Sequence, residues 1–350
     1  MQKPVILIVP SFSSAAPERM AFELAGELAA KGYAVKVAAL RRSRHHHRAG
    51  DGRIELLFGI TDLVRCCLRL LRSQECLLVH THGLRPDVAG LFLKLIFMWR
   101  VSWVSTMHND VKEDLRISHG LVGRLVAPIW LRLVVFSDRV VFLNEHLLEK
   151  YGERFGFGKA SAIRNGRLRK DGGASRTRTA PLHPSHLAVG YLGVLTPLKR
   201  IVPLARALSD LPDVTLTVAG KGPLLDAIQD IYRGRSGLNY LGQIDDISSF
   251  FAQIDVLVLP SVSEGFPLVV PEALAHGVPC VLSRLGQYRS LYGKKGVFFI
   301  DDVSIESLSQ VFGALRRDYA MFSAEARRLW VDELTAEIMA DQYDRLYASV

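Results

Sequence analysis

The sequence predicts an α/β protein built from two doubly wound parallel sheets, and three observations support this prediction. The chain has 350 residues, which is about two domains' worth of polypeptide. Short apolar runs rich in β-branched residues alternate with helical stretches, as in parallel strands joined by crossover helices. This alternation stops once, over residues 164–185, and then begins again.

The first half opens with a strand–helix–strand unit. The apolar run Val5–Val9 predicts a buried strand, and Ala34–Leu40 predicts the next one. Between them, residues 17–31 place apolar side chains at helical spacing, with Pro17 in the first turn and Gly32 as a C-cap. Later apolar runs predict strands at residues 77–80, 103–108, 139–143 and 161–163.

The second half repeats the pattern after a break. Gly, Ser, Thr, Pro and Arg dominate this break, which predicts a linker (169–186) between a first domain (1–168) and a second domain (187–332). The second domain's predicted strands are residues 188–192, 215–219, 238–241, 256–259, 279–282 and 297–300, and its predicted helices are residues 201–208, 224–233, 247–252 and 271–276. An amphipathic helix is predicted within the tail, residues 333–350.

Composition and charge exclude several classes of protein. Apolar residues make up 49% and charged residues 23%, which excludes a disordered chain, a collagen-like repeat and a small disulfide scaffold. The net charge of +9 is uneven, because residues 1–170 carry 27 Lys and Arg against 15 Asp and Glu, a net of +12, whereas residues 171–350 carry 17 against 20. We expect the basic half to meet anionic lipid, nucleic acid or a phosphorylated substrate.

The cysteines and the most apolar stretch of the sequence indicate the cellular compartment. The four cysteines form no CxxC pair, so we expect free thiols in a reducing cytoplasm. The stretch Val88–Val104 is interrupted by Lys94 and Arg100 and is shorter than the roughly 20 apolar residues of a spanning helix. No targeting segment is evident. We therefore expect a cytoplasmic protein, with a peripheral place on the inner face of the cytoplasmic membrane as an option.

The strongest functional signal is the segment Ser263–Pro279, which follows the predicted strand 256–259. Glu264 falls in the loop at the carboxyl end of that strand, where ligands bind in open α/β sheets. Glu272 falls in the first turn of the next helix, which Pro271 begins. Amides of the loop and of the helix N-terminus can face an anion, and two carboxylates can accept hydrogen bonds from sugar hydroxyls. The segment therefore indicates a site for a polyhydroxylated, anionic ligand.

Residues 264–279 resemble the signature of the family-4 retaining glycosyltransferases of GT-B fold. In that signature two Glu residues are separated by seven positions, within E-G-F-x-L and E-A-x-A-x-G-x-P. The resemblance covers most of the chain, and the final helix is similar to the one that returns to the first domain in this family. The other matching segments are Gly190–Gly193 with Lys199, Ala219–Pro223, Asp255–Ser261, Thr106–His108 and Asn165–Gly166.

This resemblance implies a fold and a reaction. The GT-B fold has two Rossmann-like domains that face each other across a cleft, the first for the acceptor and the second for the nucleotide-diphosphate sugar. The reaction is retaining transfer of a hexose-type sugar to a glycan or lipid-linked acceptor, in bacterial surface polysaccharide or lipopolysaccharide assembly. The family needs no metal and no other cofactor, and the chain has no Asp-x-Asp metal motif.

The resemblance also assigns roles to individual residues, three of which would be catalytic. Glu264 would hydrogen-bond the transferred sugar, Lys199 would neutralise the diphosphate leaving group, and His108 would reach the sugar or the β-phosphate from the first domain. Glu272 would hold the nucleotide ribose through its two hydroxyls. The other donor-binding positions are Gly193, Arg200, Gly222, Gly265, Phe266, Leu268 and Val269.

Three positions depart from the family's pattern. Val194 stands where Arg usually follows the glycine that opens the second domain, and we expect Arg200, where Gly is common, to compensate. The loop Ser13–Glu18 lacks the usual glycines, and Gly286–Ser290 lacks the carboxylate of a G-G-x-x-E motif. These departures keep a non-catalytic nucleotide-sugar-binding subunit open as an alternative function, and a GT-B epimerase or phosphorylase as a third.

Each of these residues also has a simpler interpretation. Glu264 and Glu272 could be solvent-facing charges near a helix start, where carboxylates are favoured in any case. Lys199 could be an ordinary surface lysine, and His108 a strand-end histidine with local partners only. We expect structural roles for two further histidines at a strand end, His80 and His82.

Two basic and apolar stretches of the first half suggest a membrane surface. Residues 63–72 would place Arg65, Arg69 and Arg72 on one helical face with leucines on the other, and residues 121–135 contain two arginines among apolar residues. They are either core-facing helices with solvated arginines or an interfacial face held by anionic headgroups, which the +12 charge favours. No nucleic-acid-binding motif occurs, so we do not expect nucleic acid as a partner.

Overall fold

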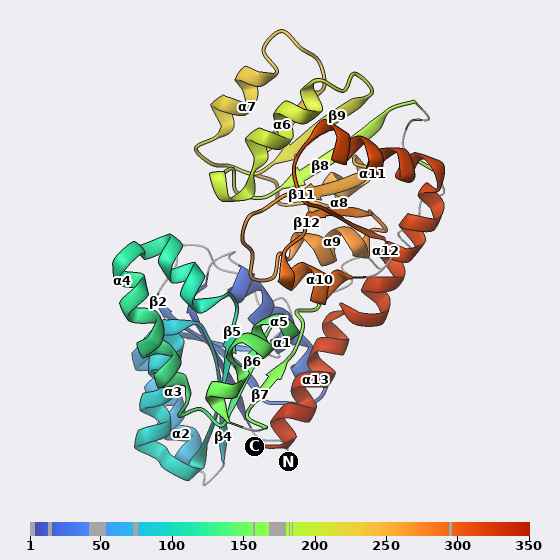
Figure 1. The fold of residues 1–350 in the computed structure, drawn as a ribbon. Coiled ribbons are helices and arrows are strands. Elements are labelled where there is room, and N and C mark those ends of the chain that lie inside the picture. Colours follow the sequence, from blue (N-terminus) through green and yellow to red (C-terminus); the bar gives the residue numbers. More distant parts are fainter. Residues whose placement is uncertain are drawn as a thin grey trace. The chain divides into compact units, whose positions relative to one another are not determined.

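The computed structural model describes residues 4–12, 16–41, 54–72, 76–156, 158–167, 180–181, 183, 185–293 and 296–350. The chain separates into two compact units, both drawn in Figure 1. The first unit contains Met1–Leu168 together with Thr335–Val350, and the second contains Arg169–Leu334. Most of the predicted linker and the beginning of the Ser13–Glu18 loop lie outside the described residues.

The described part of the first unit holds one sheet of seven parallel strands, in the order β3-β2-β1-β4-β5-β6-β7. The strands are β1 Val5–Ser11, β2 Val35–Arg41, β3 Glu55–Phe58, β4 Leu77–His82, β5 Val101–Met107, β6 Arg139–Phe142 and β7 Ala160–Ala162. Only β3 was not predicted. It is an edge strand of four residues with one buried side chain, Leu57, which is too short a pattern to show in the sequence.

Helices cover both faces of this sheet. They are α1 Ala16–Ala30, α2 Ile60–Arg72, α3 Leu84–Phe97, α4 Val111–Val134, α5 Glu145–Tyr151 and α13 Ala336–Ala348, with the short helices η1 Met98–Arg100 and η2 Gly152–Phe155. Connections between parallel strands are right-handed, so the direction in which a connection runs across the sheet decides which face its helix covers. The connections through α2, α3 and α4 all run toward β7, so these three helices lie on one face. The connection through α1 runs the other way. Figure 1 shows α2, α3 and α4 along one side of the unit, and α13 packs against α1.

The tail helix α13 is joined to the first unit at both ends. At its beginning, the amide of Ala336 donates to the carbonyl of Arg167 at 3.1 Å. Gly166 lies so close to this crossing that a Cβ atom there would come within 2.0 Å of the carbonyl oxygen of Thr335. Further along the helix, Asp341 forms an ion pair with Lys31 of the α1 end. The close approach of the two chain segments explains the glycine of the Asn165–Gly166 motif.

Helix α2 buries one side in the core of the first unit. Leu63, Cys66 and Cys67 pack there with Trp103 of β5. All four cysteines are free, as predicted, and burial raises the pKa of the Cys67 thiol to about 12. Arg65, Arg69 and Arg72 are all exposed and Leu63 is buried, in agreement with the predicted arginine and leucine faces of α2, but Leu68 is exposed as well.

The second unit confirms the prediction of a second doubly wound domain. Its described residues form one sheet of six parallel strands in the order β10-β9-β8-β11-β12-β13. The strands are β8 Leu187–Leu192, β9 Val214–Ala219, β10 Leu238–Gly242, β11 Val256–Leu259, β12 Cys280–Ser283 and β13 Val297–Ile300. The helices are η3 Pro197–Lys199, α6 Ile201–Ser209, α7 Leu225–Ile231, α8 Ile247–Ala252, α9 Val269–Ala275, α10 Gly286–Tyr292, α11 Ile305–Arg317 and α12 Tyr319–Glu333. Helix α9 begins two residues before the predicted start at Pro271.

Candidate active site

Glu264 lies in the loop after β11 and is held there by its neighbours. Its Oε1 atom accepts a hydrogen bond from the Ser261 hydroxyl at 2.8 Å and forms an ion pair with Lys199. Its backbone carbonyl accepts from the Gln287 side-chain amide at 2.8 Å. The side chain is only 10% exposed, so the interpretation of Glu264 as a solvent-facing charge is wrong. The carboxylate is fixed rather than free to move in solvent.

Lys199 reaches Glu264 from the neighbouring loop. It is the last residue of η3, which follows β8, and β8 and β11 are adjacent parallel strands. The sheet order reverses between these two strands, so both loops open at the topological switch point, where doubly wound sheets bind ligands. The Val262 amide donates to the Leu198 carbonyl at 2.9 Å and joins the loops. Lys199 is therefore part of a charged cluster and not an ordinary surface lysine.

Arg200 and Val194 flank this lysine loop in different ways. Arg200 has a φ of 53° and a ψ of 31°, the left-handed conformation that favours glycine. This conformation explains why Gly is common at the position in the family that the sequence resembles. Val194 exposes 57% of its surface, and its carbonyl accepts a hydrogen bond from the Tyr191 hydroxyl at 3.0 Å. Arg200, the cation next to Lys199 in the sequence, therefore has a strained backbone conformation.

The glycines of the second unit serve two different purposes. A Cβ atom at Gly222 would come within 2.4 Å of the Leu195 carbonyl oxygen, so the packing of two loops requires this glycine. A Cβ atom at Gly193 would meet only the Tyr191 side chain, at an ordinary contact distance of 3.5 Å. Packing against the neighbouring side chains therefore does not require a glycine at position 193. Gly222 instead holds the loop that Gly193 faces.

The segment between the two glutamates offers backbone donors. Gly265, Phe266 and Leu268 are buried, and the Phe266 ring lies 6.1 Å from that of Tyr292. Among the described residues, no hydrogen-bond acceptor lies opposite the amide N–H groups of Phe266, Leu268 or Val269. The three amides can bind an anion or sugar oxygens.

Glu272 is the fourth residue of α9 and is also buried, with 4% exposure. The solvent-facing interpretation is therefore wrong for this residue as well. Its backbone carbonyl accepts from Nδ1 of His276 at 2.8 Å, and the His276 ring stacks on Phe251 with a centroid distance of 4.9 Å. These contacts fix the end of α9. A buried carboxylate in a first helical turn can bind vicinal hydroxyls in a specific geometry.

The predicted histidine of the first unit belongs to a cluster that we call the histidine cluster, made of His80, His82 and His108. His108 directly follows β5, which ends one residue earlier than predicted, and its Nε2 lies 3.0 Å from Nδ1 of His82 at the end of β4. His80 bridges the Tyr347 hydroxyl of α13 at 2.6 Å and the Thr106 hydroxyl at 2.7 Å. His80 is structural, as predicted, whereas His82 contacts His108 directly.

The protonation of the histidine cluster follows from burial. Burial lowers the pKa of His80 to about 3, that of His108 to about 4, and that of His82 well below its usual value, so all three are neutral near pH 7. The buried Nε2 of His82 has no partner among the described residues. A bare lone pair there is less costly than a bare N–H group, which favours a proton on Nδ1 of His82. His108 then accepts at Nε2 and can donate from Nδ1.

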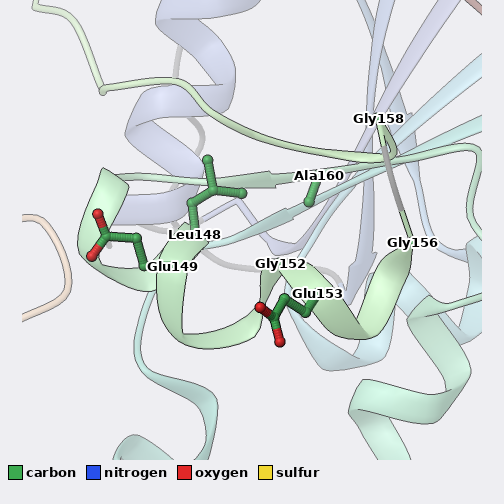
Figure 2. A pocket seen from close by; sticks show the side chains of 7 residues that line it. All are labelled: Leu148, Glu149, Gly152, Glu153, Gly156, Gly158 and Ala160. Carbon is green, nitrogen blue, oxygen red and sulfur yellow. The ribbon is translucent and has the colours of Figure 1, made fainter.

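In the described residues, neither a metal-ligand cluster nor the pocket on α5, η2 and β7 coincides with these positions. No group of three or more His, Cys, Asp or Glu side chains there could hold a metal ion. Figure 2 shows a pocket of the first unit on α5, η2 and β7, and no predicted site residue lines it. Its lining residues are Leu148, Glu149, Gly152, Glu153, Gly156, Gly158 and Ala160.

Comparison with known proteins agrees with this geometry. Residues 17–167 match the family described as Glycosyltransferase Family 4, and residues 186–318 match the one described as Glycosyl transferases group 1. The O-antigen biosynthesis glycosyltransferase WclY of Escherichia coli is 25% identical over 278 residues, which are 77% of this chain and 78% of WclY. Glycogen synthase of Mycobacterium tuberculosis is 30% identical over 272 residues, or 72% of this chain and 64% of the synthase.

Solved structures share the fold at low identity. Anabaena Alr3699/HepE in complex with UDP and glucose superimposes with a TM-score of 0.75 at 17% identity, over 100% of both chains. WaaG, a glycosyltransferase involved in lipopolysaccharide biosynthesis, gives a TM-score of 0.69 at 15% identity, over 98% of this chain and 99% of WaaG. With both halves of the chain matched, the protein belongs to the family-4 glycosyltransferases of GT-B fold.

Proposed function

We propose that the protein is a retaining, metal-independent hexosyltransferase that uses a nucleoside-diphosphate sugar and a glycan or lipid-linked acceptor. The observation that carries this proposal is the Lys199–Glu264 ion pair at the switch point of the second unit. It places a cation and a hydroxyl-binding carboxylate side by side, as transfer from a sugar diphosphate needs. UDP is the first candidate nucleotide, because the similar Anabaena protein is in complex with UDP and glucose.

In the proposed mechanism each charged group acts on one part of the donor. Glu264 accepts hydrogen bonds from the sugar, and Glu272 accepts them from the ribose. Lys199 and the loop amides neutralise the diphosphate as negative charge grows on it. The acceptor oxygen bonds to the anomeric carbon while the bond to the β-phosphate oxygen breaks. The acceptor's proton leaves with the nucleoside diphosphate.

The first unit would serve the acceptor. Neutral His108, which His82 orients, is proposed to donate from Nδ1 to the sugar or the phosphate. We propose surface polysaccharide or lipopolysaccharide assembly as the process, because similar proteins are named for O-antigen and lipopolysaccharide biosynthesis. We propose that the enzyme meets a lipid-linked acceptor at the inner face of the cytoplasmic membrane.

Donor binding and donor turnover test the proposal separately. Thermal shifts with UDP, GDP and ADP sugars identify the donor, since a ligand that binds the native state raises its stability. Release of free nucleotide is then measured with lipid-linked oligosaccharides, with and without a chelator. Release that is insensitive to the chelator is expected. Donor binding that never leads to release would favour the non-catalytic subunit, and absence of binding by any sugar nucleotide would contradict both functions.

A further inference from the structure

Helices α3 and α4 of the first unit leave a large apolar surface uncovered. Its exposed side chains include six that are each at least 60% exposed, and Trp99 of η1 reaches 82%. Two of the six lie four residues apart on α3 and three lie at four-residue intervals on α4, so they form a stripe along each helix, and Trp99 follows shortly after the end of α3. We call these residues the apolar face: Phe92, Ile96, Trp99, Leu121, Leu125 and Ile129. Residues 121–135 do face the core on one side and expose their two arginines, as one of the two interpretations predicted, but apolar side chains are exposed beside these arginines as well.

The two stripes belong to one surface. Helices α3 and α4 pack together on the same face of the sheet, as Figure 1 shows. Trp130 of α4 donates from its indole to the buried carboxylate of Asp87 on α3 at 2.6 Å, which fixes the inner sides of the helices against each other. The inner side of α3 buries Leu93, and that of α4 buries Trp130 and Leu131. Their outer sides must therefore face away from the sheet together.

The two segments that carry the apolar face are basic, although Asp114 on the first half of α4 and Asp138 after its end are accessible. Residues 115–137 contain no Asp or Glu, and residues 84–100 contain only Asp87, which is fully buried. The exposed charged side chains of these segments include Arg85, Arg124 and Arg132. An apolar stripe with aromatic residues and a basic border is the pattern of a helix that lies in the interface of an anionic bilayer.

We infer that the apolar face docks the first unit onto an anionic lipid bilayer, with its apolar side chains at the boundary of headgroups and acyl chains. The contact is at the surface, because no helix of the described residues is long and apolar enough to cross a membrane. Arg65, Arg69 and Arg72 of the neighbouring helix α2 are exposed and add positive charge. The inference rests on the membrane location proposed above and assigns it to residues. It does not depend on the donor site of the second unit.

Trp99 makes this inference directly measurable. The chain has four tryptophans, and Trp103, Trp130 and Trp330 are at most 9% exposed. The unmodified protein is mixed with vesicles of three parts phosphatidylcholine to one part phosphatidylglycerol. We expect a blue shift of the fluorescence and quenching by brominated lipid, both absent in Trp99→Phe. Vesicles of phosphatidylcholine alone should bind less. An unchanged spectrum with anionic vesicles would overturn the inference.

Exposed-site variants test the apolar contribution without disturbing the core. The triple variant Leu121→Gln, Leu125→Gln, Ile129→Gln should reduce partitioning into the anionic vesicles on the order of 100-fold. A matched control, Met321→Gln with Val331→Gln on α12 of the second unit, should leave it unchanged. Equal partitioning of the triple variant and the wild type would overturn the inference. The inference would also be overturned if the wild type forms a dimer that does not bind vesicles and the triple variant is monomeric. Circular dichroism checks folding, and UDP calorimetry reports separately on the proposed donor site.

Discussion

The Lys199–Glu264 ion pair predicts an unusual effect of removing the charge of the Glu264 carboxylate. In the free protein the ammonium group of Lys199 is already occupied by Glu264, so a bound diphosphate must compete for it. Glu264→Gln keeps the shape of the side chain and a partner for the Ser261 hydroxyl, but it removes this competition. We therefore expect UDP to bind more tightly to the variant while sugar transfer becomes slower.

The size of the effect follows from how buried the pair is. The side chains of Lys199 and Glu264 are 25% and 10% exposed, so water screens their attraction only in part. Two unit charges in contact attract by about 4 kcal/mol at an effective dielectric constant of about 20, and desolvation cancels much of this. A net gain of about 1–1.5 kcal/mol predicts roughly tenfold tighter UDP binding. Transfer should slow by about two to three orders of magnitude, as when one transition-state contact is lost.

Calorimetry with UDP and initial transfer rates measure the two effects. Lys199→Met should weaken UDP binding and slow transfer by a similar factor, and adding Glu264→Gln to it should bring no gain in affinity. Glu306→Gln, which removes an exposed carboxylate on α11, is the matched control and should change neither quantity. Weaker UDP binding by Glu264→Gln than by the wild type would refute the reasoning that Glu264 and the diphosphate compete for Lys199.

Four further results are expected. Glu272→Ala should weaken UDP binding by about 1.5–3 kcal/mol in calorimetry, because two ribose hydroxyls lose a charged acceptor, and wild-type affinity would contradict that role. Arg200→Gly and Arg200→Ala both remove the guanidinium, but only Gly relieves the left-handed backbone, so in urea unfolding the Gly variant should be about 1 kcal/mol more stable than the Ala variant. Gly222→Ala should lower the free energy of unfolding by about 2 kcal/mol or more, whereas Gly193→Ala should fold normally and bind UDP poorly. Equal stability of the two variants would argue against the packing role of Gly222. Acidification from about pH 7 to pH 5 should lower the free energy of unfolding. Histidines of the unfolded chain bind protons below about pH 6.5, whereas the buried histidine cluster, with its lowered pKa values, stays neutral. Each of the three histidines should thereby lower the free energy of unfolding by about 2 kcal/mol at pH 5. The raised pKa of buried Asp87, about 7, opposes this trend for a single group, and pH-independent urea midpoints over this range would contradict the prediction.

All strands of the two sheets except β3 could be predicted, because buried parallel strands are short continuous apolar runs. The segment Ser263–Pro279 could also be placed, since a strand, a loop and a helix start follow one another within it. The Lys199–Glu264 pair could not, because the two residues are 65 positions apart and meet only through the order of the strands. The same holds for His82 and His108, whose strands pair in parallel register.

Apolar helices were harder to interpret for a different physical reason. The sequence of α3 and α4 is apolar on most sides, which is typical of a buried helix as much as of an interfacial one. Only the tertiary structure shows which side the sheet covers and which side is left to solvent. Edge strand β3 was missed because its four residues alternate only weakly between apolar and polar side chains.

The path of the chain through the first unit has a consequence for its synthesis. Residues 169–334 are inserted between the sheet and α13, so the first unit is discontinuous and lacks α13 until residues 336–348 have been synthesised. At about 5–20 residues per second, the ribosome needs on the order of ten seconds or more to deliver that helix after the sheet has emerged. During this interval His80 lacks Tyr347, and the α1 side of the sheet is open. The second unit, continuous in sequence, can complete its fold first, which reverses the usual order in which domains mature from the N-terminus.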